Sequence, residues 1–309
     1  MTTLSSGAAG PNCSALGSVT YTILNGGPLG SGTYTTTLFK QRLDARFGST
    51  TDVFSGINSS YHALVVQANH RMSHHVQFGA SYTWSHAIDF GQNQTTFTGT
   101  NFLLFPNTIA PEKGNSIYDV PNRFVMNAVV ESPWKRSGWA GWFVNGWQWS
   151  PIYQVQNGLP YTLSVSGNAP GGAVGGINGS GGTNRIDILG NNSFRLPTAW
   201  LVDMRVAKSF SFKERYRLEL LADFFNIANK QNAMGANNNG YSISTGLVPT
   251  PSGNVTCSAA APCLNFNTSG PTPATGAPFA PVFGTINSIN NSNFLYTPRQ
   301  IQLGLRVHF

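Results

Sequence analysis

The last residues of the chain, 299–309, alternate strictly between apolar and polar side chains. The apolar positions are Ile301, Leu303, Leu305, Val307 and Phe309, and the positions between them are Gln300, Gln302, Gly304, Arg306 and His308. A period of two predicts a β-strand with one apolar face and one wet face. The wet face carries a cation and two amides, so it points to water or a polar lumen and not to a second sheet. Such a strand, ending on an aromatic residue, is typical of the last strand of an outer-membrane β-barrel.

The composition favours the same class of protein. Charged residues make up 9% of the 309 residues, against about 25% in a typical soluble domain. A soluble protein with so few charges would struggle to cover its surface, whereas a barrel turns its outer band to lipid. The net charge of +7 is dispersed, and the lysines and arginines stand mostly one at a time. This pattern argues against a nucleic-acid groove.

The sequence contains no segment that resembles a spanning helix or a signal peptide. No run approaches the roughly 18 consecutive apolar residues that a spanning helix requires. Residues 1–27 contain no cation and no apolar block, and the first basic residue is Lys40. Because an outer-membrane protein needs a signal peptide, we expect the true N-terminus to lie upstream of Met1.

Six further segments predict strands of the same kind. Residues 77–86, 200–209 and 216–226 alternate cleanly, and residues 59–72, 122–131 and 145–157 alternate with exceptions. In the first of the weaker segments Val65 falls on the wet side. In the last, Pro151 lacks the N–H that a paired strand uses, and we expect a bulge or an edge position there. Residues 46–54 are a weaker candidate for an eighth strand.

The connections between these segments alternate between short and long. The short ones are residues 73–75, 133–144 and 211–214, and the long ones are residues 89–121, 158–198 and 227–298. Outer-membrane barrels have short periplasmic turns and long extracellular loops. Five tryptophans surround the connection 133–144, where indole rings favour the membrane–water boundary; a soluble hydrophobic core is the alternative. These tryptophans are Trp134, Trp139, Trp142, Trp147 and Trp149.

We therefore predict an all-β fold, the C-terminal part of an antiparallel transmembrane β-barrel with about 7–8 strands. Residues 1–45 are expected to be an N-terminal loop or a truncated upstream barrel segment, and residues 46–309 the barrel portion. Single-chain bacterial barrels have an even number of strands, and an open edge leaves backbone groups unpaired in lipid. A portion of a larger barrel is therefore favoured, with a compact eight-stranded barrel as the alternative.

From about residue 46 to the end, the chain resembles the barrel of TonB-dependent receptors of the Oar-like type. These are common in acidobacteria and often carry a carboxypeptidase-regulatory-like domain. The similarity lies in the order of several short segments, which are residues 59–64, 77–89, 121–124, 146–148, 158–161, 194–197 and 218–226, followed by the terminal strand. The resemblance implies a 22-stranded barrel with an N-terminal plug, energised through TonB at the inner membrane. No plug, TonB box or carboxypeptidase-like domain is recognisable in this sequence, so active transport would belong to a full-length parent.

Five charged residues of two neighbouring strands are the candidates for a lumen-facing site. They are Asp203, Arg205, Arg217, Glu219 and Asp223. Opposite charges on paired strands can form cross-strand pairs. The set is either a contact surface for a plug or solute, or scaffolding that neutralises charges inside the lumen.

Cysteine and histidine positions suggest structural roles. Cys257 and Cys263 enclose a short polar segment, which favours a disulfide outside the cytoplasm; a metal site is the alternative, but no histidine lies nearby. Cys13 is left over, and its pairing stays open. His70, His74 and His75 lie near a short turn, where polar turn residues facing the periplasm are favoured over a metal site.

The sequence contains no candidate catalytic, cofactor-binding or metal-binding residues, so we expect neither an enzyme nor a cofactor. The glycine-rich run 171–182 lacks the lysine of a phosphate loop and is expected to be a flexible extracellular loop. The long loops are rich in Asn, Gly, Ser and Thr, with interspersed aromatics that suit sugars or peptides. These aromatics are Phe97, Phe102, Phe105, Tyr241 and Phe266.

The favoured function is solute uptake by the barrel section of an outer-membrane TonB-dependent receptor in a Gram-negative bacterium. The expected partners are outer-membrane lipid and an extracellular small solute or oligomer, with TonB and a plug only for the full-length parent. A small barrel that does not transport, acting as an adhesin or a passive pore, is one alternative. A soluble β-rich binding protein is another.

Overall fold

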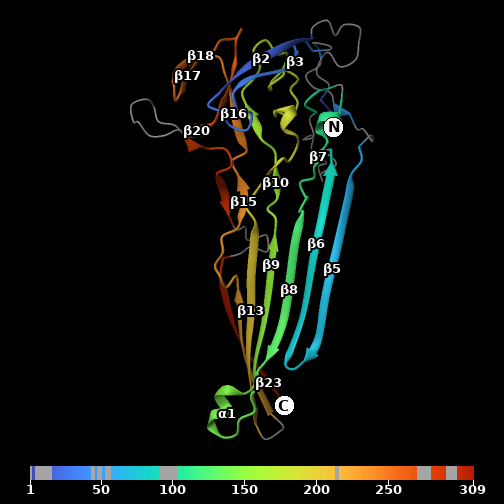
Figure 1. The fold of residues 1–309 in the computed structure, drawn as a ribbon, viewed down its shortest axis with the longest axis vertical. Helices are drawn as coiled ribbons and strands as arrows, with labels where there is room; N and C mark the ends of the chain where they lie inside the picture. The colour runs from blue at the N-terminus through green and yellow to red at the C-terminus, as the bar shows by residue number, and fades with distance from the viewer. Residues whose placement is uncertain are drawn as a thin grey trace.

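The computed structural model describes residues 2–3, 16–42, 46, 51–52, 57–90, 103–106, 108–212, 216–269, 280–289 and 298–309. All seven predicted strands are present among them. They are β5 (Ser60–Ser73), β6 (Val76–Asp89), β8 (Asn122–Glu131), β9 (Trp147–Gln156), β13 (Ala199–Phe212), β14 (Tyr216–Phe225) and β23 (Gln300–His308). They run side by side along the length of the molecule (Figure 1). In the part of the chain described, no helix has the length and apolar character needed to cross a membrane.

These strands form one antiparallel sheet in which sequence neighbours are also neighbours in space. The order is β23-β14-β13-β9-β8-β6-β5, and the short strand β7 (Gly114–Asn115) pairs with β6. Each of the seven strands has 9 to 14 residues. Since about 9–11 residues of a tilted strand cross a bilayer, every one is long enough to span it.

The register aligns the apolar positions of neighbouring strands on one face. Paired residues of adjacent strands point to the same side of a sheet. Leu220, for example, faces Leu305 of β23 on one side and Lys208 of β13 on the other. The apolar face formed in this way includes Leu64, Val66, Tyr82, Trp84, Phe124, Met126, Trp149, Tyr153, Val202, Val206, Leu218, Leu220, Leu303 and Leu305. Leu303 is 82% exposed and Trp84 57%, so the described chain leaves this face uncovered.

The opposite face of the sheet is polar. It carries Gln67, Asn69, Ser81, Thr83, Arg123, Asn127, Gln148, Ser150, Gln154, Asp203, Arg205, Glu219, Asp223, Gln302 and Arg306. Val65 faces Thr83 and therefore lies on this side, as the sequence predicted. The sheet thus separates an apolar surface from a polar one over all seven strands.

Pro151 lies in a central strand, so the expectation of a bulge or an edge position was wrong. Strand β9 pairs with β13 without a break from Trp147 to Gln156. On its other side the pairing with β8 lapses between the pair Asn127–Ile152 and the pair Val130–Trp149. Equal numbers of residues separate those two pairs on both strands, so no extra residue is inserted. Because proline has no N–H to donate, the hydrogen-bond ladder between β9 and β8 is interrupted locally.

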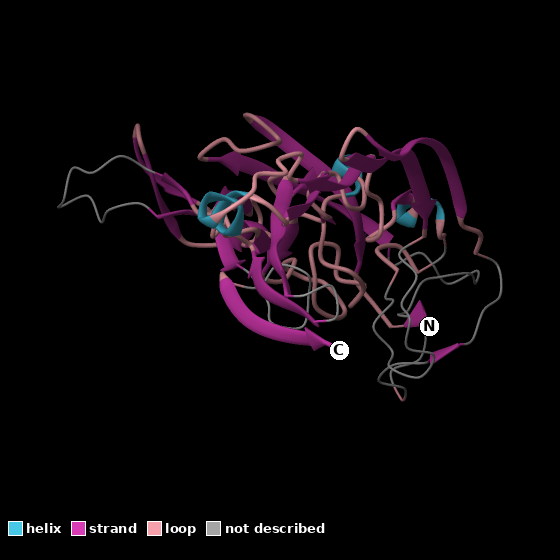
Figure 2. Cartoon of the chain, turned by 90° about the horizontal axis from the view of Figure 1, so that it is seen from below, coloured by secondary structure: helices cyan, strands magenta, loops and turns pink. Residues whose placement is uncertain are grey.

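Short and long connections lie at opposite ends of the sheet, as predicted. His74 and His75 form the turn between β5 and β6 with left-handed φ values of 48° and 66°. The connection between β8 and β9 contains the helix α1 (Trp139–Val144). Figure 1 shows α1 and the C-terminus at the same end, and Figure 2 views the chain from that end. Most of the shorter strands lie toward the opposite end (Figure 1).

The long connections form a second folded unit, which we call the cap. Its sheet has the order β11-β16-β19-β2-β3, with parallel pairing of β11 with β16 and of β19 with β2. The strands are β2 (Leu16–Leu24), β3 (Gly32–Phe39), β11 (Ser164–Ser166), β16 (Asn239–Ser244) and β19 (Cys263–Phe266). The core of the cap includes Val19, Tyr21, Tyr34, Leu104, Leu163, Ile177, Tyr241, Leu264 and Phe266.

Strands β2 and β3 were not expected from the sequence, which suggested a loop or barrel segment over residues 1–45. They belong to the cap and not to the long sheet. Of the candidate eighth strand, residues 46–54, the described positions are residue 46 and β4 (Thr51–Asp52), which pairs with β1 (Thr2–Thr3). The division of the chain at residue 46 stays a prediction.

The remaining elements are η2 (Ala110–Glu112), η3 (Asp187–Leu189), β10 (Pro160–Tyr161), β12 (Phe194–Arg195), β15 (Ala233–Ala236), β17 (Leu247–Thr250), β18 (Gly253–Thr256), β20 (Thr268–Ser269), β21 (Ala280–Pro281) and β22 (Ile286–Ile289).

The glycine-rich run 171–182 is packed into the cap, so its description as a flexible loop was wrong. Ile177, Asn178 and Ser180 are each 1% exposed. A Cβ on Gly182 would lie 1.8 Å from the carbonyl oxygen of Leu103, which only a residue without a side chain permits. Here glycine serves close backbone packing and not mobility.

Arginine on the apolar face should destabilise the protein far more than arginine on the polar face. Leu303 and Gln302 are neighbours in β23 and point to opposite faces. We expect Leu303→Arg to lower the free energy of unfolding by about 2–4 kcal/mol, because a guanidinium would enter hydrocarbon, and Gln302→Arg by less than about 1 kcal/mol. Urea unfolding in phosphatidylcholine vesicles measures both. Equal losses would contradict the assignment of the two faces.

A methyl group at Gly182 should loosen the cap. We expect Gly182→Ala to cost about 1–3 kcal/mol, because the chain around Leu103 must move. Cleavage of the cap by a protease added to intact cells should then be roughly tenfold faster. Gly246→Ala is the control, because a Cβ there meets nothing within 4 Å. Equal cleavage rates for the two variants would show that the glycine run is not tightly packed.

Candidate functional site

The five charged residues selected from the sequence lie on the polar face of β13 and β14. Arg205 pairs directly with Asp223 across the two strands, and Glu219 lies between Ser209 of β13 and Arg306 of β23. Arg217 is opposite Ser211 and His308, near the short-turn end. Asp203 faces Ile152 of β9. The period of two therefore placed all five side chains on a common surface.

Arg205 and Asp223 form the best-defined ion pair of this surface. Arg205 Nε lies 2.5 Å from Asp223 Oδ1, and Arg205 Nη2 lies 2.8 Å from Asp223 Oδ2. Two parallel hydrogen bonds hold the plane of the guanidinium against the carboxylate. The Arg205 side chain is 53% exposed and that of Asp223 19%. Because solvent screens such a pair, it stabilises the fold by about 0.2–1 kcal/mol.

The other charges of the set have different partners. Glu219 Oε2 lies 3.5 Å from Arg306 Nη1 and 3.8 Å from His308 Nε2, both of β23. Arg217 Nη2 donates to Ser209 Oγ at 2.9 Å. The carboxylate of Asp203 accepts the backbone N–H of Asn226 at 2.7 Å and so orders the chain just after β14. Most of these charges thus have a local partner.

A groove of about 540 Å³ lies on the polar face at these residues. Its walls include Asp203, Arg205, Glu219 and Asp223, together with Arg306, Asn127, Gln148 and Ser150. We did not select the last four from the sequence, although the same alternation puts them on this face. Paired charges beside amides and a hydroxyl can hydrogen-bond a polar solute or the polar surface of another protein. They offer no arrangement of nucleophile and base.

Two buried carboxylates tie the long loops together, and one of them also bonds to the sheet. Asp119 is 1% exposed; it accepts the N–H of Ala87 in β6 at 2.6 Å and pairs with Arg195. Glu112 Oε2 lies 3.1 Å from Arg185 Nη2, and both side chains are buried. A buried charge is tolerated when it is paired and hydrogen-bonded. Asp119 therefore links the loop that contains Arg195 to β6, whereas Glu112 and Arg185 join two of the long connections to each other.

Buried tyrosines give the cap polar anchors. Tyr21 Oη donates to the carbonyl of Ile177 at 2.6 Å, and Tyr241 Oη donates to the carbonyl of Gly26 at 2.8 Å. Burial raises the pKa of both phenols above their ordinary value. Both groups therefore remain neutral donors at physiological pH and connect segments that lie far apart in the sequence.

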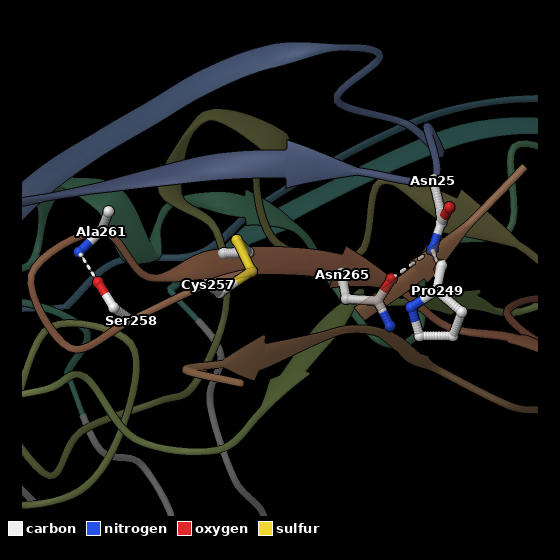
Figure 3. Close-up of a disulfide and its surroundings, with 7 residues drawn as sticks. Asn25, Pro249, Cys257, Ser258, Ala261 and Asn265 are labelled. Carbon is white, nitrogen blue, oxygen red and sulfur yellow. Dashed lines mark hydrogen bonds between the residues drawn. A yellow bond between two sulfur atoms is a disulfide. The ribbon is translucent and has the colours of Figure 1, made fainter. Parts of the chain in front are cut away.

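Cys257 and Cys263 are joined in a disulfide, the pairing that the sequence suggested (Figure 3). The bridge packs with Leu24 and Val248 in a small apolar cluster. Beside it, Asn25 Nδ2 donates to Asn265 Oδ1 at 2.6 Å and to the carbonyl of Pro249 at 3.1 Å (Figure 3). Cys13 lies outside the described residues.

Three of the loop aromatics named from the sequence lie among the described residues and contribute to the core of the cap. Tyr241 is fully buried, Phe266 is 7% exposed, and Phe105 packs against the same core. These three rings therefore stabilise the cap, and the preference for sugars or peptides suggested by the loop composition stays a prediction. Phe97 and Phe102 lie outside the described residues.

The histidines do not gather into a cluster with other metal-ligand residues. The ring of His70 stacks on Phe78 with a centroid distance of 5.4 Å, while His74 and His75 occupy the β5–β6 turn. Among the residues that the structure describes, no group of three His, Cys, Asp or Glu side chains is placed to hold a metal ion.

Comparison with known proteins gives one match. A family model described as "Outer membrane beta barrel domain" matches residues 14–187, which include the first four long strands and part of the cap. No curated protein and no solved structure matches the chain.

A double-mutant cycle should find a small coupling between Arg205 and Asp223. We expect Arg205→Gln and Asp223→Asn to show an interaction free energy of about 0.2–1 kcal/mol at pH 7, because the Arg205 side chain is 53% exposed and solvent screens the pair. Urea unfolding of both single variants and of the double variant measures it. Arg205→Gln combined with Glu131→Gln is the control, since Glu131 lies two strands away on the same face. Equal coupling in both cycles would show that the contact contributes nothing specific.

Proposed function

Because this chain belongs to the outer membrane beta barrel domain family and lies in the bacterial outer membrane, we propose that it is the C-terminal barrel section of a TonB-dependent receptor. The solute would be a saccharide or a peptide. The plug and the contact with TonB would belong to the full-length parent. The proposal involves no catalytic step.

The observation that carries the proposal is a two-faced sheet with two unpaired edges. Among the described residues, β5 and β23 each have one long neighbour. A strand edge in hydrocarbon leaves N–H and C=O groups without partners, which costs several kcal/mol per group. In the proposed receptor, further strands pair with these edges. This favours a wide barrel, of which the chain supplies one arc.

The polar face supports a wet interior for that barrel. A small barrel fills its interior with side chains, whereas a large one encloses a channel or a plug. The groove beside Arg205 and Asp223 is open and is lined by charges, amides and a hydroxyl. In a receptor this surface would contact either the plug or the solute during passage.

The cap supports recognition on the extracellular side. Its own core, its disulfide and the ion pairs of Asp119 and Glu112 fix the long loops in one arrangement. Loops held by a rigid scaffold are common binding surfaces. The same rigidity also suits an adhesin, which is the second candidate function. The uptake experiment below also distinguishes both from a passive pore.

Uptake should depend on TonB. We expect the full-length protein, expressed in a Gram-negative host, to import radiolabelled maltooligosaccharides or tripeptides at least tenfold faster in cells with TonB than in cells without it, because energy must come from the inner membrane. Equal uptake in both hosts would identify a passive pore. Binding of either probe without uptake in either host would identify an adhesin. An unrelated outer-membrane porin in the same hosts is the control.

A further inference from the structure

A second groove lies on the apolar face of the sheet, at its short-turn end. Its walls include Trp142 and Phe143 of α1, Trp147 of β9, Val206 of β13, Leu220 of β14 and Leu303 of β23. The groove has a volume of about 450 Å³. Trp142 contacts Phe210 and Phe212 at centroid distances of 5.7 and 5.2 Å, which holds α1 against β13. Because the apolar face points to lipid, the groove opens into hydrocarbon and not into water.

A basic pocket of about 470 Å³ adjoins this groove. Arg136, Lys208 and Arg217 line it together with Asn145 and backbone of the α1 connection. The groove and the pocket share Trp142, Lys208 and Phe210 as a common wall. No carboxylate lines either of them. An apolar trough therefore runs directly into a cationic pocket.

Lys208 breaks the alternation of β13. It faces Leu220 and Trp147 in the register and so lies on the apolar face, yet it is only 6% exposed. Its ammonium donates to the carbonyl of Asn145 and lies 5.2 Å from the Trp147 ring centroid. An ammonium has three donors, and within the described chain no carboxylate pairs with it. The group is thus positioned by the protein with capacity left for an anion.

The depth of this site in the membrane follows from its aromatic surroundings. Trp139 is 81% exposed and Phe143 71%. Exposed tryptophans mark the membrane–water interface, where a basic residue on the lipid face costs least. Since short turns of outer-membrane barrels are periplasmic, this interface belongs to the periplasmic leaflet.

We propose that the groove and the pocket together bind one anionic phospholipid of the periplasmic leaflet. An acyl chain would lie between α1 and strands β13, β14 and β23, and the phosphate would meet Lys208 and Arg136. Charge complementarity supports an anion, and the opening of the groove into hydrocarbon supports an acyl chain. A phospholipid combines both in one molecule. The groove and Lys208 lie on the opposite face from the proposed solute path, and the pocket reaches Arg217 of the polar face only at the short-turn end. The proposal therefore does not rest on transport.

The test measures lipid preference by tryptophan quenching. The full-length protein, extracted from outer membranes, is reconstituted in phosphatidylcholine vesicles that contain either dibrominated phosphatidylglycerol or dibrominated phosphatidylcholine. Because Trp142 and Trp147 line the groove, a bound brominated chain quenches them. We expect brominated phosphatidylglycerol to bind at least tenfold more tightly than brominated phosphatidylcholine. Each of the substitutions Arg136→Gln and Lys208→Gln should lower the affinity for phosphatidylglycerol about fivefold.

Matched variants separate this site from general attraction to negative lipid. Lys135→Gln removes the same charge from the neighbouring position, which lines neither the groove nor the pocket, and it should leave the preference unchanged. Val206→Phe fills the groove and keeps every cation, so it should abolish the preferential quenching by phosphatidylglycerol. This variant tests the proposal independently if the variant with Arg136→Gln and Lys208→Gln fails to fold. An equal preference for both lipids in the wild type would overturn the proposal. So would an equal loss in Lys135→Gln, or full competition by soluble glycerol phosphate.

Discussion

A backbone surrounded by hydrocarbon must satisfy its hydrogen bonds within the protein, and the rest of this structure depends on that requirement. The apolar face of the long sheet is uncovered across seven strands, with Leu303 at 82% exposure. Lipid can cover such a face, but it cannot bond to N–H or C=O groups. Antiparallel pairing of strands in sequence order meets the requirement, because each inner strand has a partner on both sides. By the same requirement, the outer edges of β5 and β23 still need hydrogen-bond partners, because each of these strands has one long neighbour among the described residues.

The polar face follows a weaker constraint, because water reaches it. Its charges are arranged in cross-strand pairs, Arg205 with Asp223 and Arg306 with Glu219, while amides fill the adjoining strands. Each exposed pair adds little stability. Their arrangement instead keeps the surface polar with few unpaired charges, which leaves it open to a solute or a plug. Outside the membrane the long loops have no lipid to cover them, and they bury their own apolar residues in the core of the cap.

The seven long strands could be predicted because each one carries its own signal. A single strand between lipid and water shows a period of two without reference to any other segment. The placement of Arg205 and Asp223 on one face followed from the same period, but their direct pairing needed the register between β13 and β14. The cap was different, since it joins distant segments: the bond from Tyr241 to Gly26 spans 215 residues. Val19, Tyr21 and Ile23 do alternate with polar residues, so β2 was within reach of the same rule. The packing of the glycine run was not, because its partner backbone lies at Leu103.

Two residues that break the pattern show where the sheet tolerates exceptions. Pro151 removes one donor from a central strand, and the cost stays confined to the ladder with β8, because the pairing with β13 continues past it. Lys208 puts a charge on the apolar face, where hydrocarbon would reject it at mid-depth. It lies instead beside α1, where a carbonyl and two aromatic rings receive the ammonium. Pro151 is thus accommodated by a local interruption of one ladder, while the other ladder of the same strand stays complete. Lys208 is accommodated at the short-turn end of the sheet, where a cation on the lipid face costs less than at the middle of the bilayer.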